Sequence, residues 1–235
     1  MNTMTWVVVP AAGKGVRFGG DLPKQYVQVF GRSLLHHTLT LLCRHPDITG
    51  VQVVLARKDQ HWPGWREMYG KPIKTCIGGA ERADSVLAGL RALPDSVRER
   101  DWVLVHDAAR PCLPAGDLVR LLELGGSHAV GALLAEPVRD TIKRSNARGE
   151  SEQTVPRDTL WRAQTPQMFR RATLQRALET ALASGLAITD EAMAVERLGL
   201  LPLLVEGSSC NLKVTTEDDL AVAEFWLGRL SGRDG

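Results

Sequence analysis

Small residues and cations follow the first apolar stretch of the chain, and their spacing suits phosphate binding. The stretch Trp6-Val7-Val8-Val9 ends at Pro10 and opens into Ala11-Ala12-Gly13-Lys14-Gly15-Val16-Arg17. Small side chains let backbone amides approach a ligand closely, and successive amides can form a nest for an anion, which Lys14 and Arg17 would reinforce. The segment predicts a polyphosphate site; a glycine-rich turn that serves only the chain path is the alternative.

Two familiar phosphate-binding motifs do not fit this segment. A Walker P-loop requires Ser or Thr after its Gly-Lys pair, whereas Lys14 is followed by Gly15. The dinucleotide-binding fingerprint requires a third small residue where Phe18 stands. A dehydrogenase is therefore disfavoured, and the loop indicates a polyphosphate site of another kind.

Lys24 and a glycine pair are two further candidates for contact with such a ligand. Pro23 stiffens the turn before Lys24 and presents this lysine from a restrained segment, although a lone exposed lysine is usually just solvated. The pair Gly78-Gly79 separates a predicted strand from a predicted helix and leaves the helix N-terminus and Ser85 open to polar contacts. An ordinary helix start with acidic residues in its first turns explains the second pattern equally well.

Asp107 is the candidate ligand for a metal ion. Trp102-Val103-Leu104-Val105 has the pattern of a core strand and delivers His106 and Asp107 at its carboxyl end, where ligands bind in open α/β sheets. A single aspartate there suits Mg²⁺, which usually takes one or two carboxylates together with phosphate oxygens. A plain turn residue is the alternative for Asp107. His106 is expected to pack or to hydrogen-bond rather than to ligate.

Hydrophobic periodicity predicts an alternation of strands and helices, hence a mainly parallel sheet covered on both faces. Strands are expected at 6–9, 51–55, 73–77, 102–105, 131–134 and 203–205. Helices are expected from Ser33 to before Pro46, after Gly79 through Leu93, around 118–122, over 172–184, after Thr189 and from about Thr216. Thr189-Asp190-Glu191 is expected to supply acceptors for the start of its helix, so Thr189 could be only a cap. Leu230 is expected to face inward from the last helix. Residues 57–72 are expected to form a loop with at most one turn of helix.

Residues 136–161 break this alternation. Residues 138–143 and 154–161 could pair as a hairpin, but the segment is polar and has no helix to cover it. It is therefore either a flexible flap or an arm that docks on another subunit. Its basic residues would suit an acidic substrate; they are Arg139, Lys143, Arg144 and Arg157.

The composition is that of an ordinary globular protein. A chain of 235 residues with 44% hydrophobic and 24% charged residues suits a single α/β domain over 1–235. The formal net charge of +2 is too small to indicate nucleic acid or a membrane as partner. Residues 1–5 are too short for a signal peptide, and no apolar run reaches about 18 residues. The four cysteines lie far apart without metal-binding spacing, so we expect a cytoplasmic protein with reduced thiols.

Taken together and in this order, these segments resemble the 2-C-methyl-D-erythritol 4-phosphate cytidylyltransferase family over essentially the whole chain. The motifs that carry the resemblance are PAAGKGVR (10–17), PKQY (23–26), GGAERADSV (78–86), VHDAARP (105–111), PVRDTIK (137–143), TPQ (165–167), TDE (189–191) and NLKVT (211–215). The resemblance implies a Rossmann-like, glycosyltransferase-A-like three-layer α/β sandwich with a mainly parallel sheet. It also implies a protruding β-arm, residues 136–161, that is used in dimerisation.

The same resemblance implies transfer of the cytidylyl group of CTP to 2-C-methyl-D-erythritol 4-phosphate, with Mg²⁺ and with release of pyrophosphate. The implied catalytic cations are Arg17, Lys24 and Lys213, and the implied Mg²⁺ ligand is Asp107. The implied nucleotide-binding residues are Ala11, Ala12, Gly13, Lys14, Gly15, Gly79, Ala80, Ser85 and Ala108. The implied substrate-binding residues are Arg110, Thr141, Arg157, Thr165, Thr189 and Lys213. Thr141 and Arg157 would come from the partner's arm in a homodimer.

Some positions and functions stay open at this point. A second metal ligand could stand at Cys210 or Asn211, but cysteine is a poor Mg²⁺ ligand, and Asn211 is better suited to positioning its loop. A cytidylyltransferase for another polyol phosphate, such as ribitol 5-phosphate, would share the nucleotide site, although the acceptor residues named above favour methylerythritol phosphate. A nucleotide-binding regulatory protein without catalysis is a further alternative, but it would have less need of so many cations.

Overall fold

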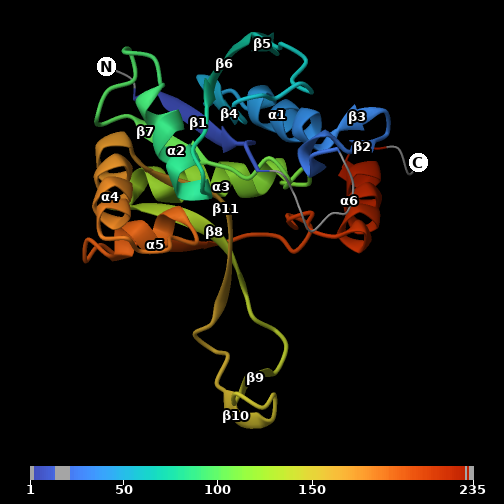
Figure 1. The fold of residues 1–235 in the computed structure, drawn as a ribbon, viewed down its shortest axis with the longest axis vertical. Coiled ribbons are helices and arrows are strands. Elements are labelled where there is room, and N and C mark those ends of the chain that lie inside the picture. The colour runs from blue at the N-terminus through green and yellow to red at the C-terminus, as the bar shows by residue number, and fades with distance from the viewer. Residues whose placement is uncertain (1–2, 14–21, 231, 233–235) are drawn as a thin grey trace.

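An eight-stranded sheet forms the centre of the molecule in the computed structural model, which describes residues 3–13, 22–230 and 232 (Figure 1). The strand order is β12-β8-β11-β7-β1-β4-β6-β5. The strands are β1 (Thr5–Pro10), β4 (Gly50–Leu55), β5 (Glu67–Met68), β6 (Lys71–Ile77), β7 (Trp102–Val105), β8 (Gly131–Pro137), β11 (Trp161–Arg170) and β12 (Leu203–Glu206). The helices are α1 (Leu34–Arg44), α2 (Arg82–Arg91), α3 (Ala115–Ser127), α4 (Arg171–Ala183), α5 (Glu191–Glu196) and α6 (Glu217–Leu230).

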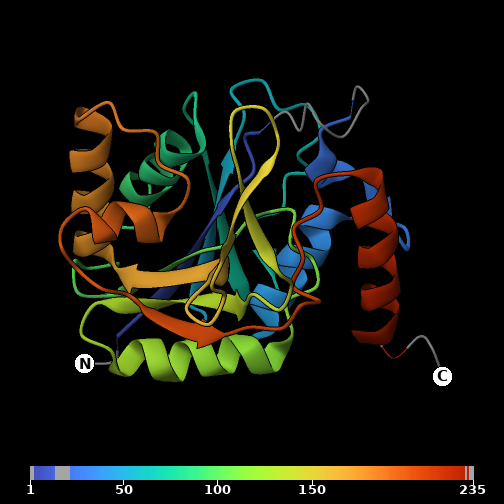
Figure 2. The same cartoon turned by 90° about the horizontal axis from the view of Figure 1, so that it is seen from below.

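Helices cover both faces of the sheet (Figure 2). Side chains alternate along β1, so Val7 and Val9 join the core under α1 and α3, while Trp6 and Val8 join the core under α2, α4 and α5. The expected three-layer α/β sandwich is therefore confirmed. Helix α6 packs separately through Ala223 and Leu227. Within the described residues, no helix has the length and apolar character needed to cross a membrane.

The sheet is mainly parallel, as expected, but its interior holds one strand that the sequence pattern did not predict. β1 pairs in parallel with β4 and β7, β4 with β6, and β8 with β12. β11 is antiparallel to both β7 and β8, and its register shifts between Ala163 and Gln167. Polar residues and Pro166 interrupt this segment, so it lacks the continuous β-branched run that marks the other core strands.

Three local predictions are wrong. Residues 57–72 contain β5 and the start of β6, which pair as an antiparallel hairpin, rather than a turn of helix. Asp190, not Thr189, caps α5, because its carboxylate stands directly before the first turn and accepts the Met193 N–H at 2.9 Å. Leu230 is 49% exposed, because it is the last residue of α6 and lies beyond the buried positions of that helix.

A long hairpin leaves the body of the molecule between β8 and β11 (Figure 1). Its strands are β9 (Ile142–Ser145) and β10 (Ser151–Val155), both nearer the tip than the expected 138–143 and 154–161. The turn decides this pairing: the Asn146 side chain accepts the backbone N–H groups of Arg148 and Glu150. The strands themselves are almost wholly exposed, so the hairpin has no core of its own.

Candidate active site

The carboxyl ends of β1, β6 and β7 meet at one edge of the sheet. The chain adds β4 and β6 on one side of β1 and then returns to place β7 on the other side, so the strand order reverses at β1. Ligands of open α/β sheets bind outside the strands at such a switch point. A pocket of about 190 Å³ lies there.

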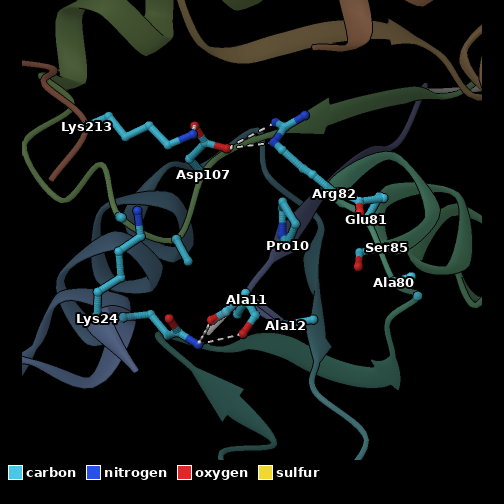
Figure 3. A pocket seen from close by; sticks show the side chains of 15 residues that line it. Pro10, Ala11, Ala12, Lys24, Ala80, Glu81, Arg82, Ser85, Asp107 and Lys213 are labelled. Atoms are coloured by element: carbon cyan, nitrogen blue, oxygen red, sulfur yellow. Dashed lines mark hydrogen bonds and ion pairs between the residues drawn. The ribbon is translucent and has the colours of Figure 1, made fainter. Parts of the chain in front are cut away.

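Segments that are far apart in the sequence line this pocket (Figure 3). The lining residues are Pro10, Ala11, Ala12, Gly13, Lys24, Gln25, Gly79, Ala80, Glu81, Arg82, Ser85, Asp107, Ala108, Ala109 and Lys213. The structure thus brings together every predicted nucleotide-binding residue that it describes, and adds Lys24, Asp107 and Lys213. The other predicted loop residues, Lys14, Gly15, Val16, Arg17 and Phe18, lie outside the described residues.

The glycine corner combines two roles. A Cβ on Gly79 would lie 2.3 Å from the Cβ of Asp84, so only glycine lets the first turn of α2 close against this corner. The backbone N–H of Glu81 donates to the Asp84 carboxylate at 3.1 Å, and the two residues form a capping box. The ordinary helix start is therefore present, and the same corner forms one wall of the pocket.

Asp107 is the centre of charge in the pocket. Its carboxylate lies 3.0 Å from Arg82 Nη2 and 3.0 Å from Lys213 Nζ, which point at it from opposite sides (Figure 3), and 3.5 Å from Arg110 Nε. Burial alone would raise the pKa of Asp107, but these three cations hold it well below its usual range. Asp107 is therefore an anion, and both of its oxygens are paired with cations.

Arg82 and Glu191 are functional candidates that the sequence analysis missed. Glu191 is fully buried, and its two oxygens accept from Arg82 Nη1 at 2.5 Å and from Nη2 at 3.1 Å. Burial alone would lower the pKa of Arg82, but Glu191 and then Asp107 raise it. Both residues stand inside motifs quoted above. In the sequence, each of the two is only a charged residue near alanines at a predicted helix start. A helix start explains such a residue without any functional role.

Replacing Glu191 by glutamine is expected to lower the free energy of unfolding by about 3 kcal/mol, because it removes a fully buried carboxylate that is the main counter-charge of the half-buried Arg82 guanidinium. Urea denaturation at pH 7 measures this change. Glu179→Gln is the matched control: Glu179 also pairs with an arginine, Arg91, at 2.8 Å, but on the surface, so no measurable change is expected. Equal free energies of unfolding for the two variants would contradict a stabilising role of the Arg82–Glu191 pair.

Hydrogen bonds hold the loop that carries Lys213. The carboxylate of Asp117, at the start of α3, accepts the backbone N–H of Ser208 at 2.7 Å and its hydroxyl at 3.0 Å. Asn211 is fully buried, and its Nδ2 donates to the carbonyl oxygen of Thr165 at 2.8 Å. Asn211 therefore positions the loop, as expected. Neither it nor the buried Cys210 lines the pocket.

Thr165 is buried next to the pocket rather than in its lining. His106 Nε2 lies 3.1 Å from the Arg110 carbonyl oxygen, which can only accept, so Nε2 carries the proton. Nδ1 of His106 then accepts the Thr165 hydroxyl, whose oxygen accepts the Asp107 backbone N–H, both at 3.0 Å. Burial lowers the pKa of His106 to about 4, so the ring is neutral at pH 7. As expected, His106 hydrogen-bonds; it orients the segment around Asp107.

The remaining predicted acceptor residues lie outside the pocket lining. Arg110 is at the edge, where its Nη1 donates to the Asn211 carbonyl oxygen at 2.6 Å. Thr189 is exposed just before α5. Thr141 and Arg157 are exposed on the hairpin, where Arg157 donates to the Arg139 carbonyl oxygen. Their roles stay predictions.

Small residues, lysines and an ionised aspartate at the switch point of a three-layer α/β fold are the arrangement expected of a nucleotidyltransferase. A family model described as 2-C-methyl-D-erythritol 4-phosphate cytidylyltransferase matches residues 5–229. The chain belongs to this family.

Individual relatives agree with this assignment. The chain is 59% identical, over 232 residues, to the 2-C-methyl-D-erythritol 4-phosphate cytidylyltransferase of Stenotrophomonas maltophilia strain K279a, with 99% of this chain and 100% of the relative covered. The crystal structure of a 4-diphosphocytidyl-2C-methyl-D-erythritol synthase matches with a TM-score of 0.81 and 36% identity, covering 97% of this chain and 100% of that one. The Francisella tularensis 2-C-methyl-D-erythritol 4-phosphate cytidylyltransferase matches with a TM-score of 0.81 and 33% identity, covering 95% and 100%.

Proposed function

We propose that the protein transfers the cytidylyl group of CTP to 2-C-methyl-D-erythritol 4-phosphate, forming 4-diphosphocytidyl-2-C-methyl-D-erythritol and pyrophosphate in isoprenoid precursor biosynthesis. The observation that carries the proposal is the pocket itself, in which Lys24, Lys213 and Asp107 converge with the small residues after β1 and β6. The chain's membership of the cytidylyltransferase family supports the same reaction and substrates. The thiols of its four cysteines are free, which fits the cytoplasmic location that we also propose.

The reaction needs positioning and charge neutralisation more than proton transfer. A phosphate oxygen of the acceptor attacks the α-phosphorus of CTP in line, and the bond to the pyrophosphate breaks as the new one forms. The segment from Ala11 to Gly15 would bind the triphosphate through its amides, and Arg17 and Lys24 would offset charge on the leaving pyrophosphate. Lys213 would hold the α-phosphate from the opposite side. Both reactants are anions, and negative charge builds up on the leaving pyrophosphate as its bond breaks. These cations therefore contribute most in the transition state.

The base would bind at the glycine corner. Gly79, Ala80, Ser85 and Ala108 line the pocket there, and Ser85 and the backbone offer hydrogen bonds to a pyrimidine. This contact set is the proposed origin of the preference for CTP.

Asp107 would hold Mg²⁺. Its carboxylate is ionised, lines the pocket and offers the hard oxygen atoms that Mg²⁺ prefers, so it fits the ion as a single protein ligand. The described residues hold no group of three or more His, Cys, Asp or Glu side chains suited to a metal, so the phosphates would supply the other ligands. When bound, the ion would neutralise phosphate charge. Lys213, which pairs with Asp107 at 3.0 Å, is close enough to share a phosphate ligand with it.

The acceptor would bind between Arg110, Thr165, Thr189 and Lys213 of one subunit and Thr141 and Arg157 of its partner. The hairpin supports this arrangement because it leaves the body and carries both of its predicted site residues on the outside. We therefore propose a homodimer whose arms, residues 136–161, complete each other's sites.

A pyrophosphate-release assay that crosses four nucleoside triphosphates with two acceptors tests the function. We expect turnover with CTP and methylerythritol phosphate and little with ATP, GTP or UTP. Preference for ribitol 5-phosphate as the acceptor would assign the chain to a different reaction, and nucleotide binding without turnover would make it a regulatory protein.

Mixed dimers test the arm. Lys24→Ala and Arg157→Ala subunits, each expected to be nearly inactive alone, should regain part of the activity when mixed, because one site of the mixed dimer keeps both native residues. Turnover is measured after the two tagged variants have been exchanged and the mixed dimer purified. Verified mixed dimers without activity would contradict an arm that acts in trans.

A further inference from the structure

The short helix that carries Lys24 depends on contacts with other elements for its orientation. It is a single 3-10 turn, η2 (Lys24–Tyr26), without a side-chain cap. On one side, Gln25 is buried, and its Nε2 donates to the carbonyl oxygens of Ala11 at 2.7 Å and Gly13 at 3.2 Å. This contact ties η2 to the end of β1.

The second contact comes from the loop after β4, which the proposed mechanism does not use. Tyr26 is buried, and its hydroxyl donates to Asp59 Oδ2 at 2.7 Å. Burial, and then Asp59, raise the pKa of Tyr26 far above its usual value, so the hydroxyl stays a donor. The other oxygen, Oδ1, accepts the backbone N–H groups of His61 at 2.9 Å and Trp62 at 3.1 Å.

Aromatic side chains anchor this loop. The rings of Trp62 and Trp65 meet edge to face with centroids 5.2 Å apart, and Trp65 meets His36 of α1 at 5.3 Å. The ring of His61 lies 5.4 Å from that of Tyr26. Asp59 is therefore an acceptor held by the body of the protein rather than a residue on a free loop.

We propose that Tyr26 and Asp59 are positioning residues that set the geometry of Lys24 for the transfer. The inference rests on the proposed function, since it assigns Lys24 to the reaction. Lys24 and Tyr26 belong to the same turn, so a tilt of η2 moves the Lys24 backbone and its Nζ, which lies 3.1 Å from the Val214 carbonyl oxygen next to Lys213. Catalytic groups need placement within about 0.5 Å, and a flexible lysine stem depends for this on the position of the turn that carries it.

Tyr26→Phe tests the inference, because it removes only the hydroxyl. We expect kcat to fall about tenfold with the KM for CTP changed less than about twofold. Asp59→Ala is expected to act alike, and Asp59→Asn to recover most of the activity, since its amide can donate to the Tyr26 oxygen while Oδ1 still accepts from the loop. The chain's only other tyrosine gives the control: Tyr69, whose hydroxyl accepts from Arg44 on the surface, should tolerate Tyr69→Phe without change.

A double-mutant cycle separates positioning from general loosening. In a Lys24→Ala background, measured by single turnover with labelled CTP, Tyr26→Phe is expected to leave the rate within about twofold, because the group it positions is gone. An undiminished tenfold loss in that background would overturn the inference, as would near-native kcat of Tyr26→Phe in the otherwise native chain. Failure of the native chain and of Tyr69→Phe to turn over CTP would instead overturn the proposed function.

Discussion

Replacing Lys24 by alanine is expected to lower kcat by about two to three orders of magnitude, while the KM for CTP changes by less than about threefold. Lys24 lines the pocket, and its Nζ lies 3.1 Å from the Val214 carbonyl oxygen, beside Lys213. A cation that offsets charge growing on the leaving pyrophosphate acts mainly in the transition state, so its loss appears in kcat. Steady-state pyrophosphate release at saturating acceptor measures both constants.

Lys71→Ala is the matched control for this prediction. Lys71 Nζ also donates to a backbone carbonyl, that of Pro46, at 3.0 Å, but Lys71 does not line the pocket. Its removal should leave kcat and KM unchanged. Near-native kcat in Lys24→Ala would contradict the proposed role, and a rise in KM alone would make Lys24 a ground-state binding residue.

Asp107→Asn is expected to abolish measurable turnover and to lower the free energy of unfolding by about 3 kcal/mol. The carboxylate is the common partner of Arg82, Arg110 and Lys213. The neutral amide therefore leaves Arg110 and Lys213 without this anion and Arg82 with Glu191 alone. The same change removes the proposed Mg²⁺ ligand. Turnover across a Mg²⁺ titration and urea denaturation at pH 7 measure the two effects.

A second substitution separates these two losses. Asp107→Asn combined with Lys213→Met should regain stability, because one of the opposing charges is gone, but not activity, because both proposed functions are lost. Asp95→Asn, at an exposed position outside the pocket lining, is the control and should change neither quantity. A stable and active Asp107→Asn variant would remove Asp107 from the mechanism.

Most of the layered fold could be predicted because its signals are local. The runs at β1, β4 and β7 are short and rich in β-branched residues, and each is buried from end to end or nearly so. Helix α1 begins after Ser33, as the sequence pattern indicated, and the Ser33 side chain accepts the His36 N–H. In each case the residues that decide the structure lie within one element.

β11 shows where such reasoning ends. The segment holds Arg162, Gln164 and Gln167, which read as surface residues, yet Gln167 is 1% exposed because its side chain bonds to Asp190 and to the Ala192 N–H from α5. Its burial is stabilised by partners more than 20 residues away in the chain. A prediction based on neighbouring residues in the sequence cannot detect these distant partners.

By itself, the sequence determined the strand ends at which chemistry could occur, since Ala11, Gly79, Asp107 and Lys213 each follow a strand or its loop and parallel strands bring such ends to one edge. Only the tertiary structure decided how the charges there are arranged. Arg82, Lys213 and Arg110 surround Asp107, and Glu191 holds Arg82 from a helix that begins 109 residues later. The physical reason is that a buried charge is tolerated only beside its counter-charge, and the chain meets that need through space rather than along the sequence.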